Sequence, residues 1–482
     1  MPSLAALVKA YDVRGIVPDD FNEDVARALG AAFAHVVGID EPGAEFGLRK
    51  AVVGHDMRAS SPALSRAFAE GIAATGGDVV LIGLCSTDGL YYASGVLDAP
   101  GAMFTASHNP AQYNGIKLCR AGARPVGQDT GLAEVRELAE QYLTAREQGA
   151  DAGFASVESP GTITEQDLLA DYAAYLRGLV DLSGARELTV VVDAGNGMGG
   201  FTVPAVLEQA AGLPALPLRI IPLYFELDGS FPNHEANPLD PANLVDLQRA
   251  VVEHGADIGL AFDGDADRCF VIDERGDPVS PSAVTALVAA REIAKERAAG
   301  RDAVVIHNLI SSRAVPEIIT EAGGTAVRTR VGHSFIKAEM AAEGAVFGGE
   351  HSAHYYFRDF WGADTGMLAA MHVLAALGEQ SGPLSVLAAD YERYVSSGEI
   401  NSTVDDAAGR TAAVRAAFET DGVVQDDLDG MTLTLDDADG RPQWWLNLRA
   451  SNTEPLLRLN VEAADEATLH EVRDKALAII RA

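Results

Sequence analysis

Short apolar runs and longer amphipathic segments alternate along most of the chain. Residues 51–53, 79–82 and 102–104 are apolar runs of strand length, and we predict a strand at each. Residues 62–74 repeat apolar positions at helical spacing and follow Ser60 and Ser61, residue types that often cap helices. We therefore predict a helix between the first two strands.

The same alternation continues through the middle of the chain. The pattern predicts helices at 165–179, 244–253 and 314–322, and strands at 188–192, 258–262 and 304–306. Strands that alternate with helices form parallel sheets covered by helices. The middle of the chain therefore belongs to the α/β class.

The pattern changes after about residue 395. Strands are predicted at 431–435 and 444–448, on either side of an acidic turn, and at 456–461. A last helix is indicated by the helical spacing of Leu469, Val472, Ala476 and Ile479. This part is expected to be a separate α+β domain.

Segments of linker composition at 150–162, 275–278 and 396–398 divide the chain. We predict three similar α/β domains with mixed, mainly parallel sheets, and a C-terminal α+β domain. The predicted boundaries are 1–155, 156–275, 276–393 and 394–482. A length of 482 residues fits three or four domains.

Composition and charge exclude several classes of protein. The chain is 48% hydrophobic and contains no apolar run of the roughly 18–20 residues that a bilayer span needs, so we expect no membrane partner. Its formal net charge of −34 would repel nucleic acid. Three widely spaced cysteines (Cys85, Cys119 and Cys269) and the lack of a signal peptide favour a reducing, cytoplasmic setting. An anionic ligand would need basic residues concentrated at its site.

The first candidate site is Thr105-Ala106-Ser107-His108-Asn109-Pro110, which directly follows a predicted strand. Loops at the carboxyl ends of parallel strands often carry function. Ser107 is a candidate nucleophile, with Lys117 close enough in sequence to assist it. A plain polar turn is the alternative, since Asn-Pro is a common turn dipeptide. A serine hydrolase is disfavoured, because no Gly-x-Ser-x-Gly motif is present.

The second candidate is Asp263-Gly264-Asp265-Ala266-Asp267-Arg268, which follows the predicted strand 258–262. Carboxylates this close repel one another unless a cation neutralises them, and oxygen ligands favour Mg²⁺ or Ca²⁺. An EF-hand is excluded, because its sixth position would be Arg268 where that loop needs glycine. A solvated acidic turn remains the alternative. Arg268 is placed to meet a phosphate.

Three further segments contain residue types that are suited to binding or catalysis. The segment 193–200 matches Gly-x-Gly-x-x-Gly, which fits a dinucleotide site or a tight backbone turn. Arg449-Ala450-Ser451-Asn452-Thr453, with Arg458 beyond, offers guanidiniums and hydroxyls to a phosphate, or forms a polar hairpin turn. Gly348-Gly349-Glu350-His351-Ser352-Ala353-His354 suits sugar hydroxyls. His333 is an acid or base candidate, although a lone histidine is often structural.

Taken in order, a nucleophile loop, a metal loop, a sugar loop and a phosphate loop fall one to each predicted domain. In this the chain resembles the α-D-phosphohexomutases over essentially its whole length. Glu350-x-Ser352 and the Arg449-Ala450-Ser451-Asn452-Thr453 segment are similar to the phosphomannomutase/phosphoglucomutase group. Phosphoglucosamine mutases typically carry Arg-Pro-Ser-Gly-Thr at the last loop, which this chain lacks.

The resemblance implies four domains around a central cleft and a phosphohexomutase that works through a phosphoserine and a hexose 1,6-bisphosphate. It implies one Mg²⁺ per chain and a small phosphosugar substrate, in a monomer or a homodimer. One departure is visible, since the family places a lysine where this chain has Asn308-Leu309-Ile310, which leaves Lys337 or an arginine as a substitute.

The resemblance also implies roles for individual residues. Ser107 would carry the phosphoryl group and, with Asp263, Asp265 and Asp267, hold the metal. Lys117 and His333 would be acid/base candidates, and Arg14 and Arg268 would line the catalytic cleft. The substrate-binding residues would be Tyr11, His108, Glu350, Ser352, His354, Arg449, Ser451, Asn452, Thr453 and Arg458.

Two rival functions use the same loops. A phosphosugar sensor would bind without catalysis, and a Mg²⁺-dependent phosphatase would release phosphate to water. The presence of Ser107, Lys117 and all three aspartates disfavours the sensor.

Overall fold

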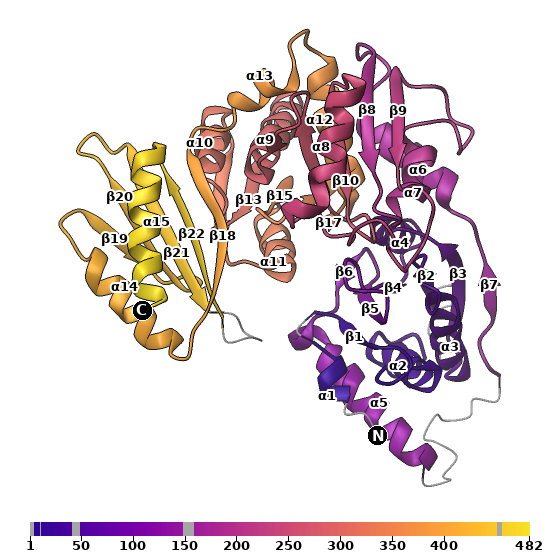
Figure 1. Cartoon of the computed structure of the whole chain (residues 1–482). Helices are drawn as coiled ribbons and strands as arrows, with labels where there is room; N and C mark the ends of the chain where they lie inside the picture. Colours follow the sequence, from indigo (N-terminus) through magenta and orange to yellow (C-terminus); the bar gives the residue numbers. More distant parts are fainter. Residues whose placement is uncertain (1–3, 10, 41–48, 148–158, 451–455) are drawn as a thin grey trace. The chain divides into compact units, whose positions relative to one another are not determined.

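The computed structural model describes the chain except for residues 1–3, 10, 41–48, 148–158 and 451–455 (Figure 1). The described residues form two compact units. The first comprises Met1–Val279 with Ser352–Ser385, and the second comprises Ser280–His351 with Val386–Ala482.

The first unit begins with a seven-stranded sheet in the order β1-β5-β4-β2-β3-β7, in which β6 pairs with β5. Strands β4, β2, β3 and β7 are parallel, whereas β5 runs antiparallel to β4 and β1. The strands are β1 (Val13–Ile16), β2 (Lys50–His55), β3 (Asp78–Leu84), β4 (Gly101–Phe104), β5 (Tyr113–Arg120), β6 (Arg124–Pro125) and β7 (Ile163–Glu165). The strands predicted at 51–53, 79–82 and 102–104 are confirmed.

The helices of this part bury an apolar core against the sheet. Phe68 on α3 lies between Phe33 and Phe104, with ring centroids 5.7 and 5.4 Å away. The helix predicted at 62–74 is confirmed, but Ser60 does not cap it through its side chain, and the Ser61 hydroxyl instead donates to Asp56. The helices are α1 (Leu4–Leu7), α2 (Glu23–Val36), α3 (Ser61–Ala74), α4 (Thr87–Val96), the 3₁₀ turn η1 (Gln128–Thr130) and α5 (Leu132–Glu147).

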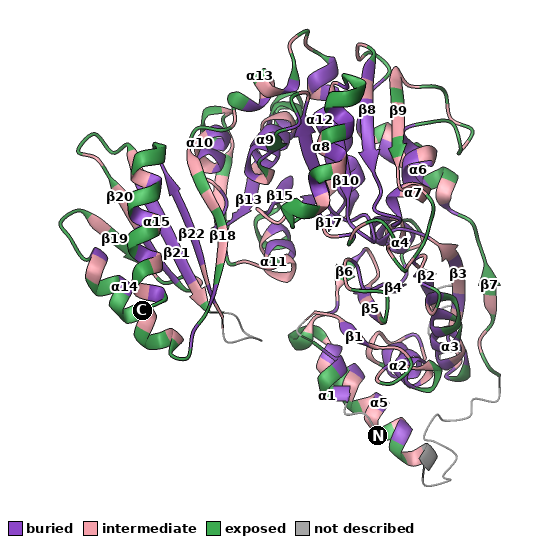
Figure 2. Cartoon of the chain, in the orientation of Figure 1, coloured by how far each residue is buried: buried purple, intermediate pink, exposed green. Residues whose placement is uncertain are grey.

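A second sheet in the first unit has the order β12-β11-β10-β8-β9. Strands β10, β8 and β9 are parallel, and β10 is buried at every position (Figure 2). The predicted linker at 275–278 lies in the turn of the β11–β12 hairpin and the first residue of β12, directly before the chain leaves the first unit after Val279. The elements are β8 (Leu188–Asp193), β9 (Leu218–Leu223), β10 (Ile258–Phe262), β11 (Cys269–Asp273), β12 (Pro278–Val279), α7 (Gly199–Val206), η2 (Pro241–Leu244) and α8 (Val245–His254).

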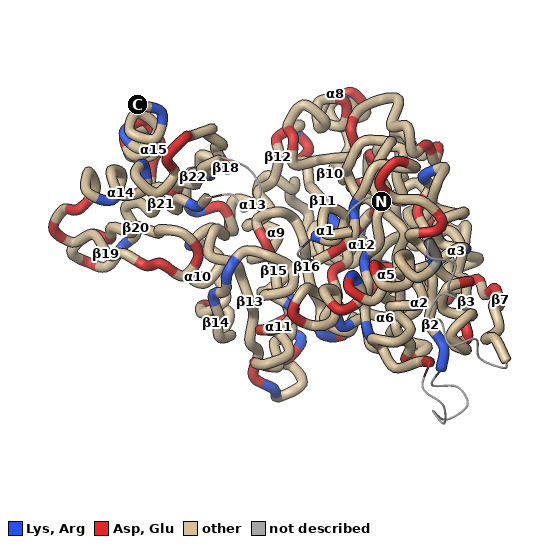
Figure 3. Tube along the Cα trace, turned by 90° about the horizontal axis from the view of Figure 1, so that it is seen from below, with Lys and Arg blue, Asp and Glu red and all other residues tan. Residues whose placement is uncertain are grey.

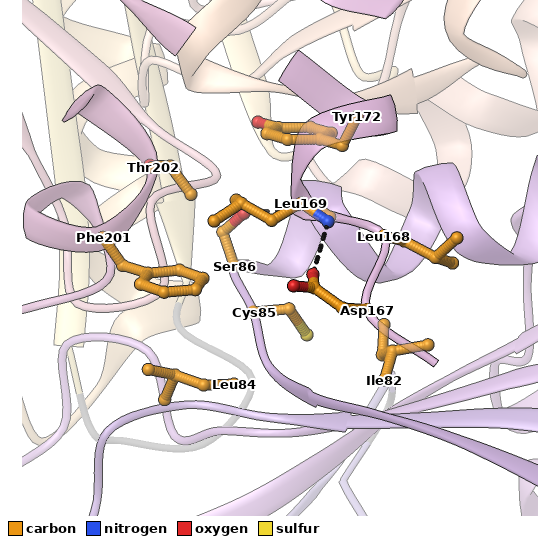
Figure 4. Close-up of a pocket in the computed structure, with 11 residues that line it drawn as sticks. Ile82, Leu84, Cys85, Ser86, Asp167, Leu168, Leu169, Tyr172, Phe201 and Thr202 are labelled. Carbon is orange, nitrogen blue, oxygen red and sulfur yellow. Dashed lines mark hydrogen bonds between the residues drawn. The ribbon is translucent and has the colours of Figure 1, made fainter. Parts of the chain in front are cut away.

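The helix predicted at 165–179 begins later than expected, as α6 (Leu169–Leu179). Residues 163–165 instead form β7, the edge strand, because they pair with β3. The helix starts where the Asp167 carboxylate accepts a hydrogen bond from the Leu169 amide at 2.9 Å (Figure 4). Pairing with a distant strand therefore overrides the local helical pattern.

The segment Ser352–Ser385 completes the first unit with β16 (Tyr355–Phe357), η3 (Arg358–Phe360), β17 (Ala363–Asp364) and α12 (Gly366–Gly378). Strands β16 and β17 are antiparallel. A Cβ at Gly366 would lie 2.6 Å from the carbonyl carbon of Arg268, so the start of α12 lies directly against the loop after β10. Close approach of this kind requires glycine.

In the second unit, β13 (Val304–Asn308) pairs in parallel with β14 (Thr325–Thr329) and β15 (Phe347–Gly349). The helices are α9 (Pro281–Ala298), α10 (Ala314–Glu321) and α11 (His333–Glu343), and α13 (Leu384–Ala389) spans the point where the chain passes between the units. The strand predicted at 304–306 and the helix predicted at 314–322 are confirmed.

The C-terminal part of the second unit is an antiparallel sheet in the order β18-β22-β21-β20-β19. The predicted strands and the final helix are confirmed, although Ile480 is buried where Ile479 was expected. The predicted linker at 396–398 forms a bulge inside β18. The elements are β18 (Val395–Thr403), α14 (Ala407–Phe418), β19 (Val423–Asp426), β20 (Met431–Asp436), β21 (Pro442–Ala450), β22 (Leu456–Ala463) and α15 (Glu466–Ile480).

Acidic residues are distributed along the whole trace (Figure 3). Within the described parts of the chain, no helix is both long and apolar enough to cross a bilayer. Polar loops follow the carboxyl ends of β4, β10 and β15, and these loops contain the sequence motifs of Ser107, Asp263 and Glu350.

Candidate functional site

Ser107 lies in the loop between β4 and β5 of the first unit. It is 4% exposed and has a left-handed backbone conformation with φ of 48°. Its amide donates to the Thr105 hydroxyl at 2.9 Å, and a Cβ at Gly264 would lie 2.3 Å from its carbonyl oxygen. A left-handed residue with a side chain is energetically costly, so the surrounding contacts hold this serine in place.

The three aspartates after β10 converge on the same place. The Ser107 hydroxyl donates to Asp263 Oδ2 at 2.8 Å. One carboxylate oxygen from each of Asp263, Asp265 and Asp267 lies within 4.8 Å of the others, and all three side chains are buried. The Asp265 and Asp267 Oδ1 atoms are buried without a hydrogen bond. Buried, unsatisfied carboxylate oxygens beside a serine hydroxyl fit a hard divalent cation.

Lys117, on β5, faces these carboxylates. Its ammonium donates to Asp265 Oδ2 at 2.7 Å and to Asp267 Oδ2 at 2.6 Å, and the Thr87 hydroxyl also donates to Asp265 Oδ2. Burial alone would raise the pKa of Asp265, but the Lys117 charge and these hydrogen bonds hold it below its usual value. Among the described residues, the hydrogen bonds of the Lys117 ammonium therefore go to the carboxylates of Asp265 and Asp267.

Arg268 and His108 lie on the Asp263 side of the cluster. The Arg268 guanidinium donates to Asp263 Oδ2 at 2.9 and 3.0 Å, and one of its nitrogens lies 2.7 Å from His108 Nδ1. Burial and the neighbouring cations Arg268 and Arg14 lower the pKa of His108 to about 3, so this imidazole is neutral. Burial, with the charges of Asp267 and Asp265, raises the pKa of Asp263 to about 7 despite Arg268.

Arg14 and Tyr11 come from the start of the chain. The Arg14 guanidinium donates to the Ala106 carbonyl at 3.3 Å and to the Asn109 side chain, and it pairs with Asp12. Tyr11 is half-buried just before β1. The structure therefore brings Arg14 into contact with the residues on either side of Ser107.

Ser352 and His354 also belong to the first unit. His354 forms an isolated backbone bridge with Arg268, and its Nδ1 lies 3.1 Å from the Ser352 hydroxyl. Its Nε2 lies 3.7 Å from Asp267 Oδ1. Two of the residues predicted to bind the sugar therefore lie beside the carboxylates.

The second unit contains Glu350, which follows β15 and is 2% exposed. Its Oε2 accepts hydrogen bonds from Asn308 Nδ2 at 3.2 Å and from the Gly332 amide at 3.3 Å. His333 begins α11, directly after Gly332, and Lys337 lies buried one turn further along that helix. Asn308, where the family lysine is missing, thus supports Glu350.

Arg449 and Arg458 are direct cross-strand partners on β21 and β22. Glu399 lies between them, with its carboxylate oxygens 3.5 and 3.7 Å from their guanidiniums, and Asp429 lies 3.5 Å from Arg449. Opposed like charges destabilise a sheet unless an anion lies between them. Ser451, Asn452 and Thr453 are outside the described residues.

Several contacts of the site were missed from the sequence. Thr87, Glu399 and Asp429 carried no motif, and Asn308 was noted only as the place where the family lysine is missing. Their only sequence signal is a polar residue at the end of a strand or the start of a helix, which is too common to single them out.

The chain is similar to known proteins in each of its four predicted domains, and the matched domains occur in the predicted order. The chain matches phosphoglucomutase/phosphomannomutase alpha/beta/alpha domain I over residues 5–146, domain II over 170–276, domain III over 281–394 and the C-terminal domain over 399–479. It is 40% identical to proteins described as phosphohexose mutases from Xanthomonas campestris pv. campestris, over 97% of both chains. The chain belongs to the phosphoglucomutase/phosphomannomutase family.

Other relatives agree with this assignment. A phosphomannomutase of Escherichia coli is 38% identical over 98% of each chain. The crystal structure of a phosphoglucomutase/phosphomannomutase family protein from Burkholderia thailandensis superposes with a TM-score of 0.82 at 30% identity, and the match covers 99% of this chain and 98% of that one. The predicted α-D-phosphohexomutase membership and the predicted four-domain fold class are confirmed, and the protein is a phosphohexomutase.

Two other features, the glycine-rich segment 193–200 and the cavity of Figure 4, are alternative candidate sites for the ligand, and neither is as well suited to it as the cluster around Ser107. The segment 193–200 packs its backbone against the metal loop, since the Met198 amide donates to the Gly264 carbonyl at 2.9 Å and a Cβ at Gly197 would be 2.7 Å from that oxygen. Close packing explains this glycine. The cavity of Figure 4 has no lysine or arginine among its lining residues and so does not suit a phosphosugar.

Proposed function

We propose that this phosphohexomutase interconverts hexose 1-phosphate and hexose 6-phosphate, with mannose, glucose or both as the sugar. The observation that carries the proposal is the Ser107 hydroxyl, held 2.8 Å from Asp263 among carboxylates with unsatisfied buried oxygens. A serine in that position is suited to carry a phosphoryl group.

The reaction requires two phosphoryl transfers. In the first, the bond between Ser107 Oγ and phosphorus breaks, and a sugar hydroxyl forms the new bond and gives its proton to a base. The product is a hexose 1,6-bisphosphate. In the second, the bond between the sugar oxygen and the phosphorus of the other phosphate breaks, and that phosphoryl group forms a new bond to Ser107 Oγ. The serine hydroxyl, protonated after the first transfer, gives up its proton, and the freed sugar oxygen takes up a proton from the acid. The phosphoserine is restored and the isomeric monophosphate is released. Added bisphosphate would phosphorylate an empty Ser107 and so act as an activator.

The charged residues of the first unit support these transfers. Asp263, Asp265 and Asp267, with Ser107, would hold one Mg²⁺, which when bound neutralises negative charge on the transferring phosphoryl group. Arg268 and Arg14 add positive charge beside Ser107. We assign proton transfer to Lys117 and His333 as the candidate acid and base.

The remaining assignments concern substrate binding. Glu350, Ser352 and His354 would contact sugar hydroxyls, Tyr11 and His108 would line the site, and the phosphate that is not being transferred would bind Arg449, Ser451, Asn452, Thr453 and Arg458. The phosphate would then replace part of the pairing that Glu399 makes with Arg449 and Arg458.

We also propose the domain boundaries 1–155, 156–275, 276–393 and 394–482, and action in the cytoplasm.

The decisive experiment follows the phosphorus by NMR. The protein is incubated with Mg²⁺, a trace of glucose 1,6-bisphosphate, and either glucose 1-phosphate or mannose 1-phosphate. Appearance of the 6-phosphate without inorganic phosphate supports the proposal. Release of inorganic phosphate would identify a phosphatase, and binding without any conversion would identify a sensor.

Replacing Glu350 with alanine tests how one site would accept two sugars. Glucose and mannose differ at C2, so a shared site should bind hydroxyls that both possess, such as those at C3 and C4. Two hydrogen bonds to a charged group, each worth about 1.5–3 kcal/mol, predict a loss in kcat/KM of roughly 10²-fold or more. The loss should be similar for glucose 1-phosphate and mannose 1-phosphate.

The control for this prediction is Glu343→Ala, which removes an exposed carboxylate from the last residue of α11. It should leave both values of kcat/KM at the wild-type level. A large loss for one sugar only in Glu350→Ala would mean that Glu350 recognises C2, and the proposed basis of dual specificity would be wrong.

A further inference from the structure

Arg58 is a buried arginine beneath the Ser107 loop that no sequence motif had assigned a role. Its side chain is 1% exposed. One terminal nitrogen donates to the carbonyls of Ser107 at 2.9 Å and Asn109 at 2.6 Å, and the other donates to the carbonyls of Pro110 and Tyr113, both at 2.9 Å. A single planar group therefore binds four carbonyls of one loop.

The guanidinium is itself held from two sides. Asp56 pairs with Arg58 Nε at 3.2 Å and accepts a hydrogen bond from the Arg58 amide at 3.0 Å. On the other side, the ring of Phe231 lies 5.2 Å from the guanidinium carbon, and a Cβ at Gly229 would be 2.8 Å from Arg58 Cα. The loop that carries Phe231 thus covers the arginine closely.

This arrangement bears directly on the conformation of Ser107. The Ser107 carbonyl accepts from Arg58 while the Gly264 backbone lies against the same carbonyl. The left-handed φ of 48° directs the hydroxyl to Asp263. Fixing the carbonyl of a residue fixes the peptide plane that follows it, so the Arg58 contacts oppose relaxation of Ser107 to an ordinary backbone conformation.

We propose that Arg58 is a positioning residue for phosphoryl transfer, which holds the Ser107 loop so that the serine hydroxyl faces the carboxylates. The inference rests on the proposed function of Ser107 as the phosphoryl carrier. Lysine cannot replace arginine here, because an ammonium has no planar fork to span four carbonyls. The charge remains in Arg58→Lys, so the variant removes geometry and leaves electrostatics largely intact.

The test measures a single phosphoryl transfer to Ser107. Dephosphorylated wild-type protein and Arg58→Lys are mixed with glucose 1,6-bisphosphate and Mg²⁺, and the phosphorylated fraction is followed by intact mass. Because a misplacement of about 1 Å at a reacting group costs about 10²-fold, we expect transfer in Arg58→Lys to be about 10²-fold slower. The KM for glucose 1-phosphate should stay near the wild-type value, since Arg58 makes no contact with substrate in this scheme.

Arg177→Lys is the matched control. Arg177 also binds three backbone carbonyls through its guanidinium, those of Val206, Glu208 and Pro214, within the same unit but on α6. The change should lower the melting temperature, but leave transfer to Ser107 at the wild-type rate. Equal slowing in both variants would mean a general loss of stability and would overturn the inference.

A second variant keeps the test open if Arg58→Lys does not fold. Asp56→Asn preserves the shape beside Arg58 but removes its ion pair, and it should also slow transfer without raising KM. An unchanged transfer rate in either folded variant overturns the positioning role alone. No transfer to the wild-type protein would overturn the proposed function and this inference together.

Discussion

Ser107→Ala should lower the rate of interconversion by about 10³-fold or more, because it removes the atom that carries the phosphoryl group between the two transfers. Alanine keeps the size of the residue to within one oxygen, and the loop contacts of the Ser107 backbone with Thr105 and Arg58 do not involve the hydroxyl. Binding of glucose 1-phosphate, measured by calorimetry, should therefore survive. The phosphorylated form should disappear from the intact mass spectrum.

Ser65→Ala is the matched control for this prediction. Ser65 is also a buried serine of the first unit, but its hydroxyl donates to the Pro62 carbonyl at 3.0 Å, within α3. This variant should keep both the phosphorylated form and wild-type turnover. Near-normal turnover in Ser107→Ala would mean that another group carries the phosphoryl, and the assignment of the nucleophile would be wrong.

Asp265→Asn should lower kcat by about 10²–10³-fold, the cost of losing one group that stabilises charge in a transition state. The change replaces a carboxylate that accepts from Lys117 and Thr87 and has a second, unsatisfied oxygen. Asparagine nearly preserves the shape but removes one negative charge from the cluster. The Mg²⁺ concentration needed for half-maximal activity should therefore rise.

Asp257→Asn makes the same change at the opposite end of the strand. Asp257 precedes β10 and binds the Arg186 guanidinium and the Thr189 amide, both at 2.8 Å. It should leave the Mg²⁺ dependence of activity unchanged. If Asp265→Asn kept both its activity and its Mg²⁺ dependence, the metal would have to bind elsewhere.

The candidate site was only partly predictable from the chain. Ser107 and the three aspartates could be found because each group lies in a short loop directly after an apolar strand, and both the strand and the loop are local patterns. Lys117 was expected to assist Ser107, but the sequence did not predict that its ammonium also contacts Asp265 and Asp267, which are 148 and 150 residues away. No local pattern contains a contact of that range.

Secondary structure shows the same division. Strand β10 was predicted over its full range, because a run of buried apolar residues needs no partner to be recognised. The start of α6 was wrong, because residues 163–165 pair with β3, and that pairing is decided by the neighbouring strand. The linker composition at 396–398 lies between the matched domain III and the C-terminal domain, but it does not reveal that these residues form a bulge in β18.

By itself, then, the sequence determined the alternation of strands and helices, the order of the four domain types and the chemistry of each loop. These properties depend on residues within about ten positions of one another, where periodicity and residue type act directly. Only the tertiary structure decided that Arg58 binds the Ser107 loop, that Thr87 and Lys117 share Asp265, and that Glu399 lies between Arg449 and Arg458. Each of these contacts joins separate elements, and its geometry exists only once the intervening chain has folded.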